Sequence, residues 1–184
     1  MHEKANDMVS RRQEPLRRRY RERPSEAGIV DHARTASIGS DPFHGTVVIG
    51  DDQLALGFGI HRAVGGDHDA SNPGDILCAA LAACLDSTLR MTAARMGVAL
   101  EALEVQVRAI ADVRGCLLVD RDVPAGFQRI DIEVGIKAAE GVDPAQISML
   151  TSAAERCCVV LQTLRSDLPV GTRIREPAIN TVAD

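Results

Sequence analysis

Two stretches of the chain alternate between apolar and polar residues in the pattern of a half-buried strand. They lie at residues 103–107 and 129–136, and neighbouring residues of a strand point to opposite faces of a sheet. The apolar positions of the two stretches are Leu103, Val105, Val107, Ile130, Ile132, Val134 and Ile136. Shorter apolar runs at residues 116–119 and 170–174 predict two further strands.

The first third of the chain predicts a small antiparallel meander. Strand-like runs at residues 28–36, 45–49 and 53–60 are separated by turn-forming residues, among them Asp41-Pro42.

The longest predicted helix covers residues 73–96. Asn72 is a natural N-cap, and Gly97 follows the last turn, where a left-handed C-cap is usual. Every residue from Ile76 to Leu85 is apolar, and a helix that is apolar all round is buried on every side. We therefore expect a sheet to cover one side of this helix and a second subunit to cover the other.

A second long helix is predicted for residues 144–165, with Asp143 as its N-cap, and a polar helix for residues 12–23. The order along the chain is then strands, buried helix, strands, helix and strand. This order predicts an α+β fold, because a doubly wound α/β fold would alternate single strands with helices.

Composition favours one globular domain and argues against a nucleic-acid-binding protein. Hydrophobic residues make up 45% of the chain, which is enough for a core, whereas aromatic residues make up 2% and offer no base-stacking platform. The net charge of −5 divides into +4 for residues 1–24 and −9 for the remainder. The basic arm is expected to be a solvated helix or a strap across a partner subunit, with a tether to an anionic partner as the alternative.

Targeting and metal signals are not found in the sequence. The first 25 residues contain no apolar run, and the longest apolar run of the chain is about half a membrane span. We therefore expect a cytoplasmic protein without membrane association, whose five cysteines are reduced thiols. Neither the cysteines nor the five histidines show metal-ligand spacing, so no metal or other cofactor is expected.

Three cysteines stand in helical contexts that could support thiol chemistry. Cys84 lies midway along the apolar helix, and Cys157 and Cys158 lie together on the second helix. The apolar face of the second helix runs between Cys157 and Cys158, so periodicity allows either of them to point inward. Free cysteine is also a common packing residue, and the pattern alone leaves that interpretation open.

The residues around these cysteines carry a family resemblance. Residues 72–84, with the sequence NPGDILCAALAAC, resemble the NPE-[EQ]-LL-AAALAAC motif of the OsmC/Ohr family. Residues 158–164, with the sequence CVVLQTL, are similar to the CPV-x-x-TL motif of the same family. Gly126-Phe127 matches the GF that precedes a long strand in the family.

The resemblance covers residues 27–175, which leaves residues 1–26 as an arm and residues 176–184 as a loose tail. It implies an intertwined homodimer in which antiparallel sheets surround two long helices. It also implies that Cys84 attacks an organic hydroperoxide as a thiolate. Cys158 would then condense with the resulting sulfenic acid to a disulfide, which a dithiol reduces.

The resemblance further implies that an arginine from the N-terminal strands lowers the pKa of the first cysteine, held by a glutamate at the start of the apolar helix. Arg34 is the candidate arginine, with Arg62 as a rival. Gly74 occupies the position of the glutamate, and Asp75, one residue further, is either its replacement or a first-turn dipole residue. Val159 stands where the family has proline. These departures indicate a divergent OsmC-like subgroup and leave a non-catalytic dimeric binding protein for an apolar ligand as the alternative.

Overall fold

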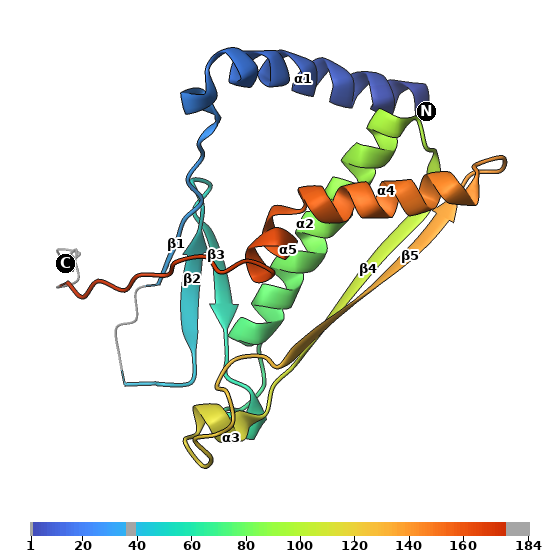
Figure 1. Ribbon diagram of the computed structural model, residues 1–184. Coiled ribbons are helices and arrows are strands. Elements are labelled where there is room, and N and C mark those ends of the chain that lie inside the picture. Colours follow the sequence, from blue (N-terminus) through green and yellow to red (C-terminus); the bar gives the residue numbers. More distant parts are fainter. Residues whose placement is uncertain (1, 36–39, 176–184) are drawn as a thin grey trace.

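The computed structural model describes residues 2–35 and 40–175 and shows an α+β protein (Figure 1). The helices are α1 (His2–Glu22), α2 (Pro73–Met96), α3 (Val113–Cys116), α4 (Pro144–Cys157) and α5 (Val159–Leu164), with 3-10 turns η1 (Pro24–Ala27) and η2 (Arg62–Val64). The strands are β1 (Ala33–Thr35), β2 (Gly45–Ile49), β3 (Leu54–Phe58), β4 (Leu100–Ile110) and β5 (Arg129–Ala138).

The strands pair in two separate antiparallel sheets. The first sheet has the order β1-β2-β3, and the second is the long β4–β5 hairpin. Val105 lies opposite Val134 and Val107 opposite Ile132, so the predicted alternation places aliphatic side chains on one face of the hairpin. That face packs against α2 and the core, which confirms the prediction of two half-buried strands.

Helix α2 begins and ends where its sequence predicts. The Asn72 side chain accepts hydrogen bonds from the backbone N–H groups of Gly74 (2.8 Å) and Asp75 (3.3 Å). Asp75 Oδ2 accepts in return from the Asn72 backbone N–H at 3.0 Å, which completes a capping box. At the other end Gly97 adopts a left-handed conformation (φ 68°) and closes the helix.

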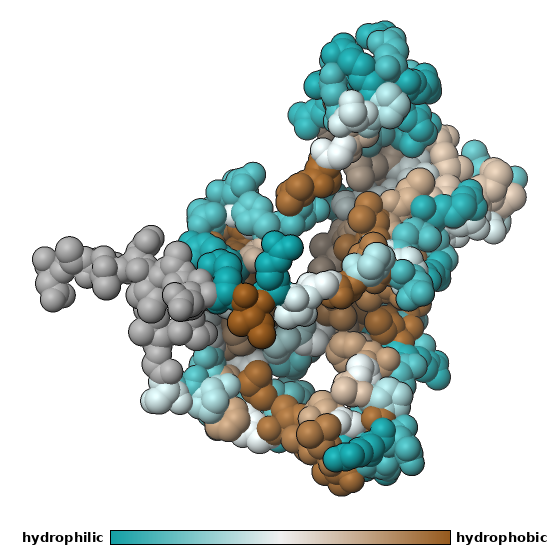
Figure 2. Space-filling view, turned by 60° about the vertical axis from the view of Figure 1, so that its left-hand side comes forward, coloured by the Kyte–Doolittle hydropathy of each residue, from teal (hydrophilic) through white to brown (hydrophobic). Residues whose placement is uncertain are grey.

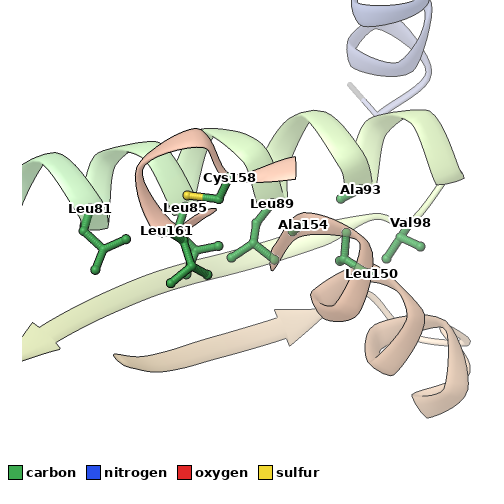
Figure 3. Close-up of a cluster of buried hydrophobic side chains, with 9 residues drawn as sticks. All are labelled: Leu81, Leu85, Leu89, Ala93, Val98, Leu150, Ala154, Cys158 and Leu161. Carbon is green, nitrogen blue, oxygen red and sulfur yellow. The ribbon is translucent and has the colours of Figure 1, made fainter. Parts of the chain in front are cut away.

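The core is a stripe of α2 packed against α4, α5 and the β4–β5 hairpin. Leu81, Leu85, Leu89 and Ala93 recur at intervals of four residues and form one face of the helix. Figure 3 shows the side chains that meet this face from the other elements, which are Val98, Leu150, Ala154, Cys158 and Leu161.

The opposite face of α2 is partly exposed within residues 2–35 and 40–175. Ala79, Ala80 and Ala83 are exposed there, and Leu54 of the first sheet is 63% exposed. Within the described residues α2 is also the one helix long and apolar enough to cross a membrane, although its inner stripe packs as that of a core helix. The prediction that a second subunit covers this face stays a prediction.

Two of the predicted strands do not form. Residues 113–116 make the helical turn α3, because the Asp112 side chain caps it and the Arg114 guanidinium pairs with Asp112 (2.6 Å) and Asp120 (3.4 Å). The apolar residues at 117–119 follow as an exposed turn rather than a strand. Residues 170–174 are extended without strand pairing.

The boundaries of three predicted elements shift. The first strand is shorter than predicted, at Ala33–Thr35, and the polar helix begins earlier, at His2. The second long helix is interrupted at Cys158, whose φ of −73° and ψ of 108° are extended, so it divides into α4 and α5. The tail at residues 176–184 lies outside the described residues.

Candidate functional site

The structure brings Cys84 and Cys158 together where α2 meets the junction of α4 and α5. Cys84 is partly buried, Cys158 has an exposed fraction of 0%, and each thiol shifts the pKa of the other. Cys157 is exposed, so Cys158 is the one of the two neighbours that points inward. Figure 3 shows the Cys158 side chain at the start of α5, above Leu85 and Leu161.

The interruption at Cys158 supplies free hydrogen-bond donors to this pair. In a continuous helix the N–H of Val159 would donate to the carbonyl of Glu155, four residues earlier. Here the side chain of Gln162 donates to that carbonyl instead, at 2.7 Å. The N–H groups of Val159 and Val160 lie in the first turn of α5, where the helix itself offers them no acceptor, and hydrogen bonds from both lower the pKa of the Cys84 thiol.

These donors outweigh the effect of burial on Cys84. Burial alone would raise the pKa of the Cys84 thiol, but hydrogen bonds from the Val160 N–H, the Cys158 thiol, the Val159 N–H and the Thr88 hydroxyl lower it below its usual value. A hydrogen bond to an anion stabilises the charged form, so each donor favours the thiolate. The surroundings of Cys84 therefore lower the pKa of its thiol despite its burial.

Cys158 has the opposite tendency. Burial raises the pKa of the Cys158 thiol, and the hydrogen bond to Cys84 and the charge of Cys84 raise it further, against the opposing effect of the Leu161 and Val160 N–H groups. The pair is thus asymmetric, with the pKa of Cys84 lowered and that of Cys158 raised. Such a pair can perform nucleophilic attack at one sulfur and disulfide formation with the other.

The predicted charged residues are not part of this arrangement within one chain. Arg34 is exposed on β1 and donates to Gln53 Oε1 at 3.2 Å, and Arg62 is exposed in η2. Asp75 serves in the capping box of α2. None of the three is among the groups that shift the pKa of Cys84, so their predicted roles remain predictions.

An aromatic ring occupies the space that a side chain at position 74 would need. A Cβ atom added to Gly74 would lie 3.0 Å from Cζ of Phe127 and 2.9 Å from Oδ1 of Asn72. A glutamate at this position would therefore require the Phe127 ring to move. This chain has no glutamate at position 74, and Phe127 and Asn72 fill the space that its side chain would need.

Metal chemistry has no support among the described residues. No group of three or more histidine, cysteine, aspartate or glutamate side chains there could hold a metal ion.

Sequence reasoning missed the donors that surround Cys84. Thr88 lies one helical turn after Cys84, a spacing that is visible in the sequence, but a lone threonine in a helix carries no functional signal. The N–H groups of Val159 and Val160 depend on the interruption at Cys158, and no glycine or proline in residues 155–164 predicts it.

A proline at position 159 isolates the contribution of its N–H group. Cys158 already has extended dihedral angles, and proline suits the first position of a helix, so Val159→Pro should leave the backbone in place. It removes one donor to the sulfur, and the pH midpoint of Cys84 titration should move up by about one unit, as expected for a lost hydrogen bond to a charged group. The measurement is alkylation of the Cys84 peptide as a function of pH, followed by mass spectrometry.

The matched control is Val159→Ala, which keeps the N–H. The Val159 side chain is 70% exposed, so its truncation should leave the Cys84 titration unchanged. An unchanged midpoint in Val159→Pro would contradict a role for this N–H group.

Comparisons with known proteins agree with this architecture. A family model described as OsmC-like protein matches residues 66–173. The search of curated proteins found no match. Among solved structures, an organic hydroperoxide resistance protein from Legionella pneumophila is 21% identical, with a TM-score of 0.59 over 77% of this chain and 93% of that one.

Two further structures share the fold at similar levels. An OsmC-like protein of unknown function from Vibrio cholerae is 12% identical with a TM-score of 0.62, over 74% of this chain and 94% of that one. An organic hydroperoxide resistance protein from Elizabethkingia anophelis is 18% identical with a TM-score of 0.57, over 77% and 92% of the two chains. At these identities the likeness shows the fold alone.

Proposed function

The chain belongs to the OsmC-like protein family, whose model matches more than half of it, and from this premise we propose that it reduces organic hydroperoxides with Cys84 and Cys158. The observation that supports the proposal most is the asymmetric thiol pair, in which the pKa of Cys84 is lowered and that of Cys158 is raised. An attacking thiolate beside a protonated resolving thiol is the arrangement that two-cysteine peroxide reduction requires.

The proposed reaction has three steps. The Cys84 thiolate attacks one oxygen of the peroxide, the O–O bond breaks, and the leaving alkoxide takes a proton to become an alcohol. Cys84 is then a sulfenic acid, and the Cys158 sulfur attacks it, so that the hydroxyl leaves as water with the Cys158 proton. A dithiol reduces the Cys84–Cys158 disulfide by two successive thiol–disulfide exchanges and is itself oxidised to a disulfide.

A cavity near the pair offers room for a bulky organic substrate. It has a volume of about 290 Å³, and its lining combines apolar side chains, among them Leu81, Phe127, Leu161 and Leu164, with the polar side chains of Gln128, Arg129 and Arg165. Leu81 lies one helical turn from Cys84, and Leu161 one turn from Cys158. The apolar side chains would accommodate an alkyl or aryl group, which hydrogen peroxide lacks.

We also propose that the protein works as a homodimer in the cytoplasm. The exposed alanine face of α2 and the exposed Leu54 of the first sheet need cover that a second copy would supply. Arg34 lies on that sheet, so its predicted role near a Cys84 thiolate depends on how the two copies assemble. A cytoplasmic location would keep the five cysteines reduced, as the proposed thiol chemistry requires.

The proposal is tested by counting thiols before and after one equivalent of an organic hydroperoxide, with peptide mass mapping. We expect two thiols to disappear together and a Cys84–Cys158 disulfide to form, with slower loss for hydrogen peroxide. A thiol count that does not change would overturn the proposal.

One observation favours the alternative of a binding protein for an apolar ligand. A cavity of about 620 Å³ lies between α1, α2 and the start of β4, away from the cysteine pair. Its apolar lining includes Met8, Val9, Met91 and Leu103. Thiols that resist peroxide, together with retention of an apolar ligand, would support this alternative instead.

A further inference from the structure

We infer that the Thr88 hydroxyl is a donor to the reacting sulfur of Cys84, which it stabilises as a thiolate by turning away from a backbone carbonyl. The inference rests on the proposed function of Cys84 and goes beyond it by naming a residue of the site. Among the described residues, Thr88 is the one buried polar side chain, with an exposed fraction of 8%. It lies four residues after Cys84, on the same face of α2.

The Thr88 hydroxyl has a carbonyl and a thiol of the same residue to act on. It donates to the backbone carbonyl of Cys84 at 2.7 Å, and a hydrogen bond from it lowers the pKa of the Cys84 thiol. A hydroxyl has a single proton to donate, so it serves one of these acceptors at a time. When the sulfur is a neutral thiol the carbonyl is the better acceptor, and when it is a thiolate the anion is.

The carbonyl of Cys84 can release this proton without being left unsatisfied. The Cys84 carbonyl lies inside α2 and accepts the backbone N–H of Thr88 in the helical ladder. Ser87 Oγ also lies 3.0 Å from it and shares its one proton between this carbonyl and that of Ala83, at 2.9 Å. Rotation of the Thr88 hydroxyl toward the sulfur therefore leaves no orphaned acceptor.

Few other titratable groups act on Cys84 within one chain. Cys158 is the only titratable side chain among the named contacts that shift its pKa. Asp86 on α2 is paired with Arg90 at 2.5 Å, and Glu155 on α4 is paired with Arg165 at 3.0 Å. Loss of the Thr88 hydroxyl would consequently show directly in the titration of Cys84.

The test compares Thr88→Val with Thr88→Ser by alkylation of the Cys84 peptide across a pH series, without peroxide. Thr88→Val keeps the branched shape, removes the hydroxyl and should move the pH midpoint up by about one unit. At a fixed pH below the midpoint the alkylation rate should fall about threefold, because the thiolate fraction drops about tenfold and the remaining thiolate is more nucleophilic. Thr88→Ser keeps the hydroxyl and should restore the wild-type midpoint.

Ser87→Ala is the matched control, since it removes a neighbouring hydroxyl that donates only to carbonyls. Its midpoint should equal that of the wild type. Thr88→Ala serves as a second hydroxyl-free variant if Thr88→Val folds poorly. A midpoint that is the same in the wild type and in the folded hydroxyl-free variant would overturn the inference. Because the readout needs no peroxide, that result is distinct from failure of the proposed peroxidase activity.

Discussion

Replacement of Cys84 by serine is expected to abolish reduction of organic hydroperoxides, with a loss of roughly a thousandfold or more. The thiolate is the nucleophile, and a serine hydroxyl held by the same donors stays protonated at neutral pH. The measurement is consumption of an organic hydroperoxide with a dithiol as reductant. A Cys84→Ser protein that retains the wild-type rate would show that Cys84 is not the nucleophile.

Replacement of Cys158 separates the two halves of the proposed cycle. Cys158→Ser should still consume about one equivalent of peroxide and then accumulate a sulfenic acid at Cys84, because no buried thiol is available to condense with it. Cys157→Ser is the matched control, since Cys157 is the adjacent residue but is exposed. It should turn over as the wild type does, and failure of this variant alone would assign the resolving role to Cys157.

A large loss of stability is expected from Leu150→Ala. Leu150 has an exposed fraction of 0% on α4 and packs in the core against the stripe of α2 (Figure 3). Its truncation should lower the free energy of unfolding by about 3 kcal/mol, through lost burial and a residual cavity. The measurement is urea unfolding at one fixed protein concentration, because a dimer gains stability with concentration.

Met149→Ala provides the control on the same helix. Met149 is adjacent to Leu150 but 56% exposed, so its truncation should change the free energy of unfolding by about 0.5 kcal/mol or less. Equal effects of the two substitutions would mean that α4 does not pack as the structure shows.

Elements with a strong local pattern were predictable from the sequence. The alternation in β4 and β5 and the caps of α2 each depend on residues close in the chain, and the structure has them where predicted. The sequence predicts a strand at residues 116–119, because its apolar residues suggest burial. In the structure Leu118 is 78% exposed, and the ion pairs of Arg114 determine the local turn instead.

The interruption at Cys158 was beyond local prediction. The residues on either side are ordinary helix or strand formers, and the break is stabilised by Gln162, which replaces a backbone donor at the carbonyl of Glu155. The family resemblance drew attention to Cys84 and Cys158, and the structure places them together. The sheet that contains Arg34 makes few contacts with the rest of its own chain. Neither the sequence pattern nor the geometry of a single chain therefore decides the role of Arg34.

The hydropathy of the surface agrees with the expectation of a second subunit, because apolar side chains lie exposed on a single chain. Figure 2 shows apolar side chains exposed on this face of the protein, next to strongly polar ones. A stable monomer rarely leaves apolar surface of this kind in water. The sequence predicts a second subunit because α2 is apolar on every side, and the structure shows exposed apolar surface. Both observations have one physical origin, which is aliphatic surface that a single chain does not bury.

The burial of Cys158 also determines the direction from which an oxidised site can be regenerated. In a Cys84–Cys158 disulfide only the Cys84 sulfur has surface that an incoming thiolate can approach, so Cys158 must be the departing sulfur. The raised pKa of Cys158 makes it a poor leaving group, which slows exchange with small monothiols. The mixed disulfide would then form on Cys84 and revert unless a second thiol of the same reductant displaces it. In the proposed cycle, the rate of turnover therefore depends on which dithiol can reach Cys84.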